Sequence, residues 1–210
     1  MIDLMKTFDE NNIERKAQDT RFSFFIYSLK NNSFDDIIQE TIEINTNEII
    51  KLKNLKINLT HHFNKIVEEI ILLEKMKVLA EMKIVFAYKN FEINLKYFLI
   101  NIFSDFNSEL CYKKDYLKSF LKEKKIDYCK LSSYNEIDQL RRVNNAIKHS
   151  KIEQTKNINS IPELKNKNQI DYSDILTFYE RVKNTQISFI IDLRTKILSN
   201  SNIKTSKILY

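Results

Sequence analysis

The chain has 210 residues, of which 43% are hydrophobic and 30% charged, with a formal net charge of +6 at pH 7. It contains no glycine and a single proline, Pro162. Sandwiches, barrels and doubly wound folds use glycine for turns with positive φ, so this composition favours an all-helical protein. It also excludes the glycine-rich phosphate loops of P-loop and dinucleotide-binding folds.

The sequence favours a reduced, cytoplasmic protein without a cofactor. Cys111 and Cys129 are too few for a disulfide framework or a zinc site, so we expect buried thiols. His61 and His62 are adjacent and would project about 100° apart on a helix, which argues against a shared metal ion. The first residues do not resemble a signal peptide, and no apolar run approaches the roughly 20 residues that cross a bilayer. We therefore expect no metal and no membrane contact.

Apolar periodicity divides the chain into predicted helices and loops. Apolar residues at i, i+3, i+4 and i+7 predict amphipathic helices, and clusters of asparagine, serine and proline predict the breaks between them. In chain order we expect a loose arm over 1–15, helices over 19–30, 34–58, 60–103, 113–126, 133–150 and 172–198, a loop over 153–170, and a loose tail over 199–210.

Two features of this division stay open in the sequence. Thr41–Ile44 alternates like a strand, although the surrounding residues favour a helix. A single helix over 60–103 would be roughly 65 Å long, so an interruption near 76–83 is an alternative. The fold class that follows is all-α, a compact bundle of about five helices forming one domain over 1–210.

The positive charge is concentrated in one segment. Residues 113–156 contain twelve Lys or Arg and six Asp or Glu, a net charge of +6, which equals that of the whole chain. A localised positive field attracts polyanions such as RNA. The alternative is a solvated face that keeps the protein soluble.

The predicted helix after Ser133 carries a polar stripe. Ser133 and Glu136 have the spacing of a capping box, which sets where the helix begins. At 100° per residue, Ile137, Leu140, Val143 and Ile147 share one side of this helix. Four residues lie on the opposite side and define the polar stripe: Asp138, Arg142, Asn145 and His149. Arg141 and Lys148 flank the stripe.

The segment from Arg142 to His149 resembles the signature of HEPN domains. That signature is an arginine four to six residues before a histidine, often with an asparagine nearby, on one helix of a compact bundle. Here six residues separate Arg142 from His149, and Asn144 stands where the commonest version has its arginine. The resemblance implies a HEPN-like fold.

The resemblance also implies a function: a metal-independent endoribonuclease of a toxin–antitoxin, abortive-infection or related phage-defence system. It implies a homodimer with the site at its interface, and an antitoxin or another defence subunit as a further partner. Arg142 would neutralise the scissile phosphate, His149 would assist proton transfer and Asn145 would orient the phosphate. The RNA 2′-hydroxyl would attack the adjacent phosphorus and leave a cyclic phosphate. Further contacts with RNA are expected from Arg141, Asn144, Lys148 and Lys151.

Two alternatives remain open at this point. The Asn144 departure favours a non-catalytic HEPN-like subunit that binds RNA or a partner of a defence system. In the other alternative the protein is a helical scaffold, with Asp138 and Arg142 as an ordinary i, i+4 ion pair and Asn145 and His149 as surface residues.

Overall fold

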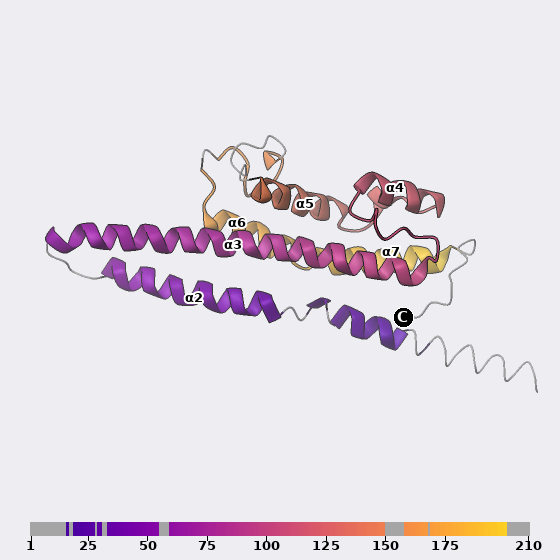
Figure 1. The fold of residues 1–210 in the computed structure, drawn as a ribbon, viewed down its shortest axis with the longest axis horizontal. Coiled ribbons are helices and arrows are strands. Elements are labelled where there is room, and N and C mark those ends of the chain that lie inside the picture. Colours follow the sequence, from indigo (N-terminus) through magenta and orange to yellow (C-terminus); the bar gives the residue numbers. More distant parts are fainter. Residues whose placement is uncertain are drawn as a thin grey trace, which may run out of the picture. The chain divides into compact units, whose positions relative to one another are not determined.

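The computed structural model describes residues 16, 19–27, 29–30, 33–54, 59–149, 158–167 and 169–200 (Figure 1). Every regular element in these ranges is a helix, which confirms the predicted all-α class. Besides the helical residues of 19–30, the elements are α2 (Ser33–Asn54), α3 (Leu59–Ile102), α4 (Lys114–Glu123), the short 3-10 helix η1 (Tyr128–Lys130), α5 (Tyr134–Lys148), α6 (Tyr172–Val182) and α7 (Thr185–Ser199).

The chain folds as two compact units. Unit 1 comprises Met1–Asn31, Asn90–Tyr134 and Asn184–Tyr210, and unit 2 comprises Asn32–Lys89 and Asn135–Lys183. The uninterrupted helix α3 contributes its first part to unit 2 and its last part to unit 1. Each unit is described separately below.

Most predicted helices are present. The described residues of 19–30 are helical, and α2 shows that the strand-like stretch Thr41–Ile44 is helical as well. Helix α3 runs without the interruption considered near 76–83. The predicted loose arm over 1–15 lies outside the described residues. Of the predicted tail over 199–210, only Ser199 and Asn200 are described, as the last residue and the C-cap of α7.

The prediction of one helix over 172–198 was wrong. Helix α6 ends at Val182 and α7 begins at Thr185, with Asn184 as the N-cap of α7. Asparagine is less favourable than most residues inside a helix, although the side chain of Asn184 makes no cap hydrogen bond here. The predicted apolar residues on either side of the break are all buried: Ile175, Phe178, Tyr179, Val182, Phe189, Ile190, Leu193 and Ile197.

The core of unit 2 has two parts. In the first, Ile38, Ile42 and Ile49 of α2 pack against Leu72 and Met76 of α3, and Figure 1 shows these two helices side by side. In the second, α5, α6 and the 158–170 segment pack against α3. The predicted loop over 153–170 lacks long helices where it is described, but it contributes four buried side chains: Ile158, Ile161, Leu164 and Ile170.

Arg181, on α6, forms hydrogen bonds with the 158–170 segment and with α5. Its Nε and Nη2 donate to the two carboxylate oxygens of Glu163 at 2.5 and 2.9 Å, and Nη2 also donates to Oε1 of Gln139 at 2.9 Å. The hydrogen bond from Arg181 lowers the pKa of the Glu163 carboxyl, against the opposing effect of burial. The 158–170 segment is therefore bound to α6 through the ionised carboxylate of Glu163.

Glu163→Gln is expected to lower the free energy of unfolding by about 1 kcal/mol at neutral pH, since the pair is partly exposed. Because the pKa of Glu163 is lower in the folded than in the unfolded state, its contribution is present above the unfolded pKa and is lost as the pH falls through the folded value. Urea unfolding of both proteins at pH 7 and pH 3 measures this. A gap between them that widens towards pH 3 would contradict the assignment.

Unit 1 is built from aromatic contacts. The ring of Phe189 on α7 lies 5.4 Å from that of Phe91 and 5.5 Å from that of Tyr128, centroid to centroid. The rings of Phe103 and Phe120 meet edge to face at 5.3 Å. These contacts join the end of α3 to α4, η1 and α7, and they hold the lysine-rich α4 in place.

Helix α4 ends in a Schellman motif without glycine. The N–H of Ile126 donates to the carbonyl of Leu121 at 2.8 Å, and the N–H of Lys125 donates to that of Lys122 at 2.9 Å. Lys125 has a φ of 59°, in the left-handed region that glycine usually occupies at this position. The hydrophobic contact expected for the motif is available, because Leu121 and Ile126 are both buried.

Lys125→Gly is expected to raise the free energy of unfolding by about 0.5–1 kcal/mol. Glycine removes the clash of Cβ in the left-handed region, which outweighs the entropy it adds to the unfolded chain. Lys125→Ala, which keeps Cβ, is the matched control and should change stability little. Urea midpoints that are equal for the glycine and alanine variants would contradict this reading of the cap.

Candidate functional site

Helix α5 of unit 2 presents the polar stripe. The helix begins at Tyr134, one residue after the predicted cap. Ser133 has a φ of 60°, whereas a capping serine has an extended backbone, so the predicted capping-box geometry was wrong although the helix start was right. At the other end, the N–H of His149 donates to the carbonyl of Asn145 at 3.1 Å, which continues the helical turn to His149.

The two sides of α5 differ as the sequence predicted. Ile137, Leu140 and Val143 are buried in the core of unit 2. Asn145 and His149, on the opposite side, are exposed. The stripe therefore lies on the surface of unit 2 and is open to another molecule at its Asn145 and His149 end.

Asp138 is shared by two arginines. Its Oδ1 accepts from Nε and Nη2 of Arg141 at 3.2 and 3.0 Å, and its Oδ2 lies 3.3 Å from Nε of Arg142. These three side chains are between 20% and 30% exposed, so the cluster is partly shielded from water. The ion pair between Asp138 and Arg142 was one of the two interpretations left open by the sequence. This ion pair is present, and the single carboxylate of Asp138 offsets one of the two positive charges of Arg141 and Arg142.

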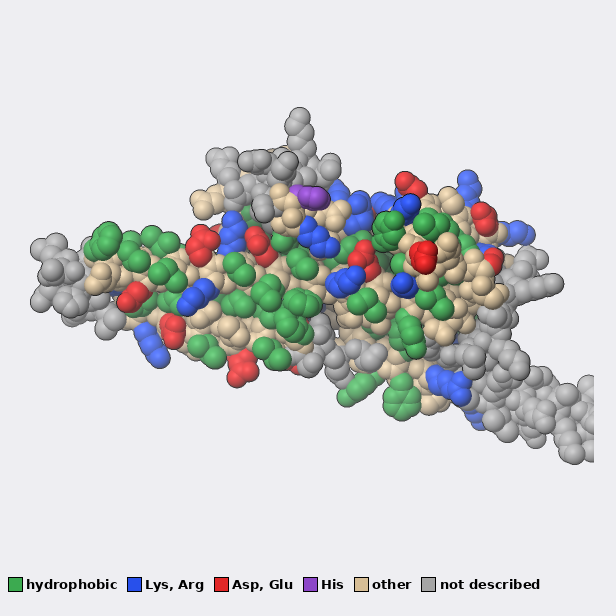
Figure 2. All heavy atoms as spheres, in the orientation of Figure 1, with side chains coloured by type: hydrophobic (Ala, Val, Ile, Leu, Met, Phe, Trp, Pro, Cys, Tyr) green, Lys and Arg blue, Asp and Glu red, His purple; other side chains and the backbone are tan. Residues whose placement is uncertain are grey.

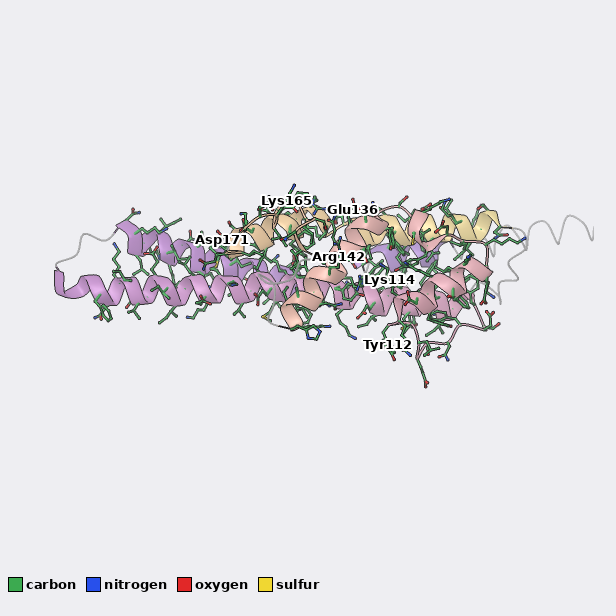
Figure 3. The ribbon with its side chains drawn as sticks, turned by 90° about the horizontal axis from the view of Figure 1, so that it is seen from above. Tyr112, Lys114, Glu136, Arg142, Lys165 and Asp171 are labelled. Carbon is green, nitrogen blue, oxygen red and sulfur yellow. The ribbon has the colours of Figure 1, made fainter. Side chains whose placement is uncertain are left out.

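Ser160 holds Arg142 from the other side. Nη1 of Arg142 donates to the hydroxyl of Ser160 at 2.8 Å, which brings the 158–170 segment against α5. The guanidinium of Arg142 thus contacts Asp138 of its own helix and Ser160 of the 158–170 segment. Figure 3 shows where Arg142 lies on α5. Ser160 could not be predicted from the sequence, because the contact joins residues eighteen positions apart through a loop.

Of the four residues expected to make further contacts with RNA, three are described, and these differ in their placement. Lys148 is exposed. Asn144 is fully buried, so the structure corrects its expected place on the surface. At 100° per residue Asn144 lies on the apolar side of α5, and its Nδ2 donates to Oδ1 of Asn145 at 3.3 Å. Lys151 lies outside the described residues, and Arg141 is half-buried beside Asp138.

The other candidates add little to this site. Among the described residues, no three His, Cys, Asp or Glu side chains lie close enough together to hold a metal ion, and the side chains of His61 and His62 are outside that set. Cys111 is half-buried and Cys129 is exposed, so the expectation of buried thiols was wrong. None of the described helices is both long and apolar enough to cross a bilayer.

Comparison of the chain with protein-family models, with curated proteins and with solved structures finds no match.

Proposed function

We propose that this chain is a metal-independent endoribonuclease of a cytoplasmic toxin–antitoxin, abortive-infection or related phage-defence system. Arg142 binds the scissile phosphate, Asn145 orients it and His149 assists proton transfer as the RNA 2′-hydroxyl attacks the adjacent phosphorus. The bond from phosphorus to the 5′-oxygen breaks, and the products are a cyclic phosphate and a free 5′-hydroxyl.

The observation that carries this proposal is the fixed guanidinium of Arg142 on the helix face that also exposes Asn145 and His149. Arginine is permanently charged and matches the geometry of phosphate oxygens, and histidine titrates near neutral pH. Contacts to Asp138 and Ser160 orient the guanidinium before a substrate arrives, so little conformational entropy is lost on binding. With Arg141, Lys148 and Asp138, this face carries a net positive charge.

A second copy of the chain is the partner that this proposal requires. The first part of α3 exposes large apolar side chains, among them Phe63, Ile66 and Ile70. Figure 2 shows hydrophobic side chains mixed with charged ones along this helix. The stretch 65–77 contains three glutamates and three lysines, so it has no net charge to oppose pairing with a second copy. We propose that this surface pairs two copies.

A second candidate function is favoured by the ion pairs of Asp138. Because this carboxylate already neutralises part of the charge of Arg141 and Arg142, the face is less attractive to a phosphate than two isolated arginines would be. In that candidate the chain binds RNA or a defence-system partner, such as an antitoxin, without cutting.

Incubation of the purified protein with total RNA in EDTA tests the proposal. Fragments ending in a cyclic phosphate, formed by a protein whose molar mass in solution is that of two chains, are the expected result. Retention of RNA without fragments, weakened steeply by added salt, would select the second candidate. A single-chain molar mass with neither activity would contradict both.

A further inference from the structure

A cavity in unit 1 lies apart from the polar stripe. It has a volume of about 460 Å³ and is lined by residues of α4, η1 and the turn between them: Lys118, Lys122, Lys125, Ile126, Asp127, Tyr128 and Cys129. This volume is within the range of small-molecule sites in proteins. No role proposed above uses this cavity.

Three lysines line the cavity. Lys118, Lys122 and Lys125 follow one another at i, i+4 and i+7. Like charges one turn apart disfavour a helix. None of the ion pairs between described residues involves these three side chains. The arrangement therefore gathers positive charge that no ion pair within the described part of the chain neutralises.

The one carboxylate of the cavity lining is already engaged. Oδ1 of Asp127 accepts from the N–H of Cys129 at 3.0 Å, and Oδ2 lies 3.7 Å from Nζ of Lys130. The lining therefore has three positive charges against one negative charge that is directed to other groups. Such a cavity favours an anion.

The floor of the cavity is apolar. Ile126 and Tyr128 are 2% and 6% exposed, and the ring of Tyr128 packs edge to face against the rings of Tyr134 and Phe189. Lys125 occupies its left-handed position in place of the glycine that would be more stable there.

We propose that this cavity binds the terminal phosphate of a nucleotide, with the three lysines on the phosphate oxygens and the nucleoside over the apolar floor. A terminal phosphate is a dianion, so it matches a cluster of ammonium groups better than the singly charged diester of a nucleic-acid backbone. The phosphate can come from a free nucleotide or from the end of an RNA strand. This inference does not depend on the proposed ribonuclease.

Alkylation of Cys129 by iodoacetamide reports on the occupancy of the cavity, because this exposed thiol lies in its lining. Mass spectrometry follows each cysteine separately, and Cys111, outside the lining, is the internal control. Millimolar ADP is expected to slow alkylation of Cys129 at least five-fold and leave Cys111 unchanged. Adenosine, which lacks phosphate, should protect neither. Equal protection by adenosine would overturn the proposal, and so would a lack of protection both by ADP at 10 mM and by a 5′-phosphorylated RNA.

Charge variants show whether the lysines bind the phosphate. Lys118→Gln with Lys122→Gln is expected to raise the Kd for ADP at least ten-fold, whereas Lys113→Gln with Lys165→Gln, the same loss of charge outside the lining, should leave it unchanged. Lys125→Gly should weaken binding several-fold even though the fold becomes more stable. Equal Kd values for the wild type and the Lys118 and Lys122 variant would overturn the proposal.

Two oligonucleotides distinguish the sources of the phosphate. A short RNA with 2′-O-methyl groups cannot undergo attack by its 2′-hydroxyl, so its binding is independent of any cleavage. Protection of Cys129 by the 5′-phosphorylated form and not by the 5′-hydroxyl form would assign an RNA end as the ligand. Protection by ADP alone would assign a free nucleotide, and equal protection by both oligonucleotides would overturn recognition of a terminal phosphate.

Discussion

Arg142→Ala is expected to reduce the rate of RNA cleavage by about 10²-fold or more, which is the usual cost of removing one group that stabilises charge in a transition state. Arg142 lies beside Asp138 and donates to Ser160, whereas the adjacent Arg141 donates to Asp138. Arg142→Lys should lose most of the activity as well, because an ammonium group lacks the planar fork of the guanidinium. Cleavage of a defined RNA in EDTA measures both variants.

Arg141→Ala is the matched control for this experiment. Arg141 is the adjacent residue, it pairs with the same carboxylate, and its removal costs the same charge. We expect its cleavage rate to stay within a few-fold of the wild type, with weaker binding of RNA at raised salt. Equal losses from Arg141→Ala and Arg142→Ala would show that the face contributes charge alone. Undiminished cleavage by folded Arg142→Ala would refute the assigned role.

His149→Ala separates the two candidate functions further. In the ribonuclease the imidazole takes part in proton transfer, so its removal should lower the cleavage rate by about 10²–10⁴-fold and leave the affinity for RNA almost unchanged. His149 is exposed and lies beyond the last residue of α5, so the fold should tolerate the change. A variant that loses affinity and has no activity to lose would instead support binding without cleavage.

The helices could be predicted because their determinants are local. Apolar periodicity and the absence of glycine identify α2, α3, α4 and α5 without any knowledge of their neighbours. The break at Asn184 was missed because the apolar pattern on its two sides is in register with a single helix. The burial of the 158–170 segment was also missed, since a loop has no periodicity that reports which side chains enter the core.

The stripe could be predicted in part for a similar reason. Residue spacing on α5 places Arg142, Asn145 and His149 on one side, and the same arithmetic places Asn144 on the buried side. The sequence could not show that Asp138 binds Arg141 as well as Arg142, because both spacings are compatible with a helical ion pair. The contact with Ser160 and the lysine-lined cavity depend on tertiary packing.

A buried charge in unit 2 was likewise hidden from sequence analysis. The side chain of Lys83, on α3, is 2% exposed, and its Nζ lies 2.7 Å from Oδ1 of Asp35 on α2 and 4.9 Å from the ring centroid of Tyr179 on α6. Burial, together with a hydrogen bond to Asp35, raises the pKa of the Tyr179 hydroxyl well above its usual value. The cluster joins three helices, and forty-eight positions separate its two charges.

Asp35→Ala is expected to lower the free energy of unfolding by about 3–5 kcal/mol, because it leaves the ammonium of Lys83 buried without its carboxylate. Lys83→Met should cost less than half as much, since methionine fills the apolar site and Asp35, 27% exposed, can still be hydrated. The double variant should be more stable than Asp35→Ala alone, because it contains no buried charge. Urea unfolding of the three proteins measures this order. If Lys83→Met lowered the free energy of unfolding more than Asp35→Ala does, the cost of an unpaired buried ammonium would not be the main energetic effect in this cluster.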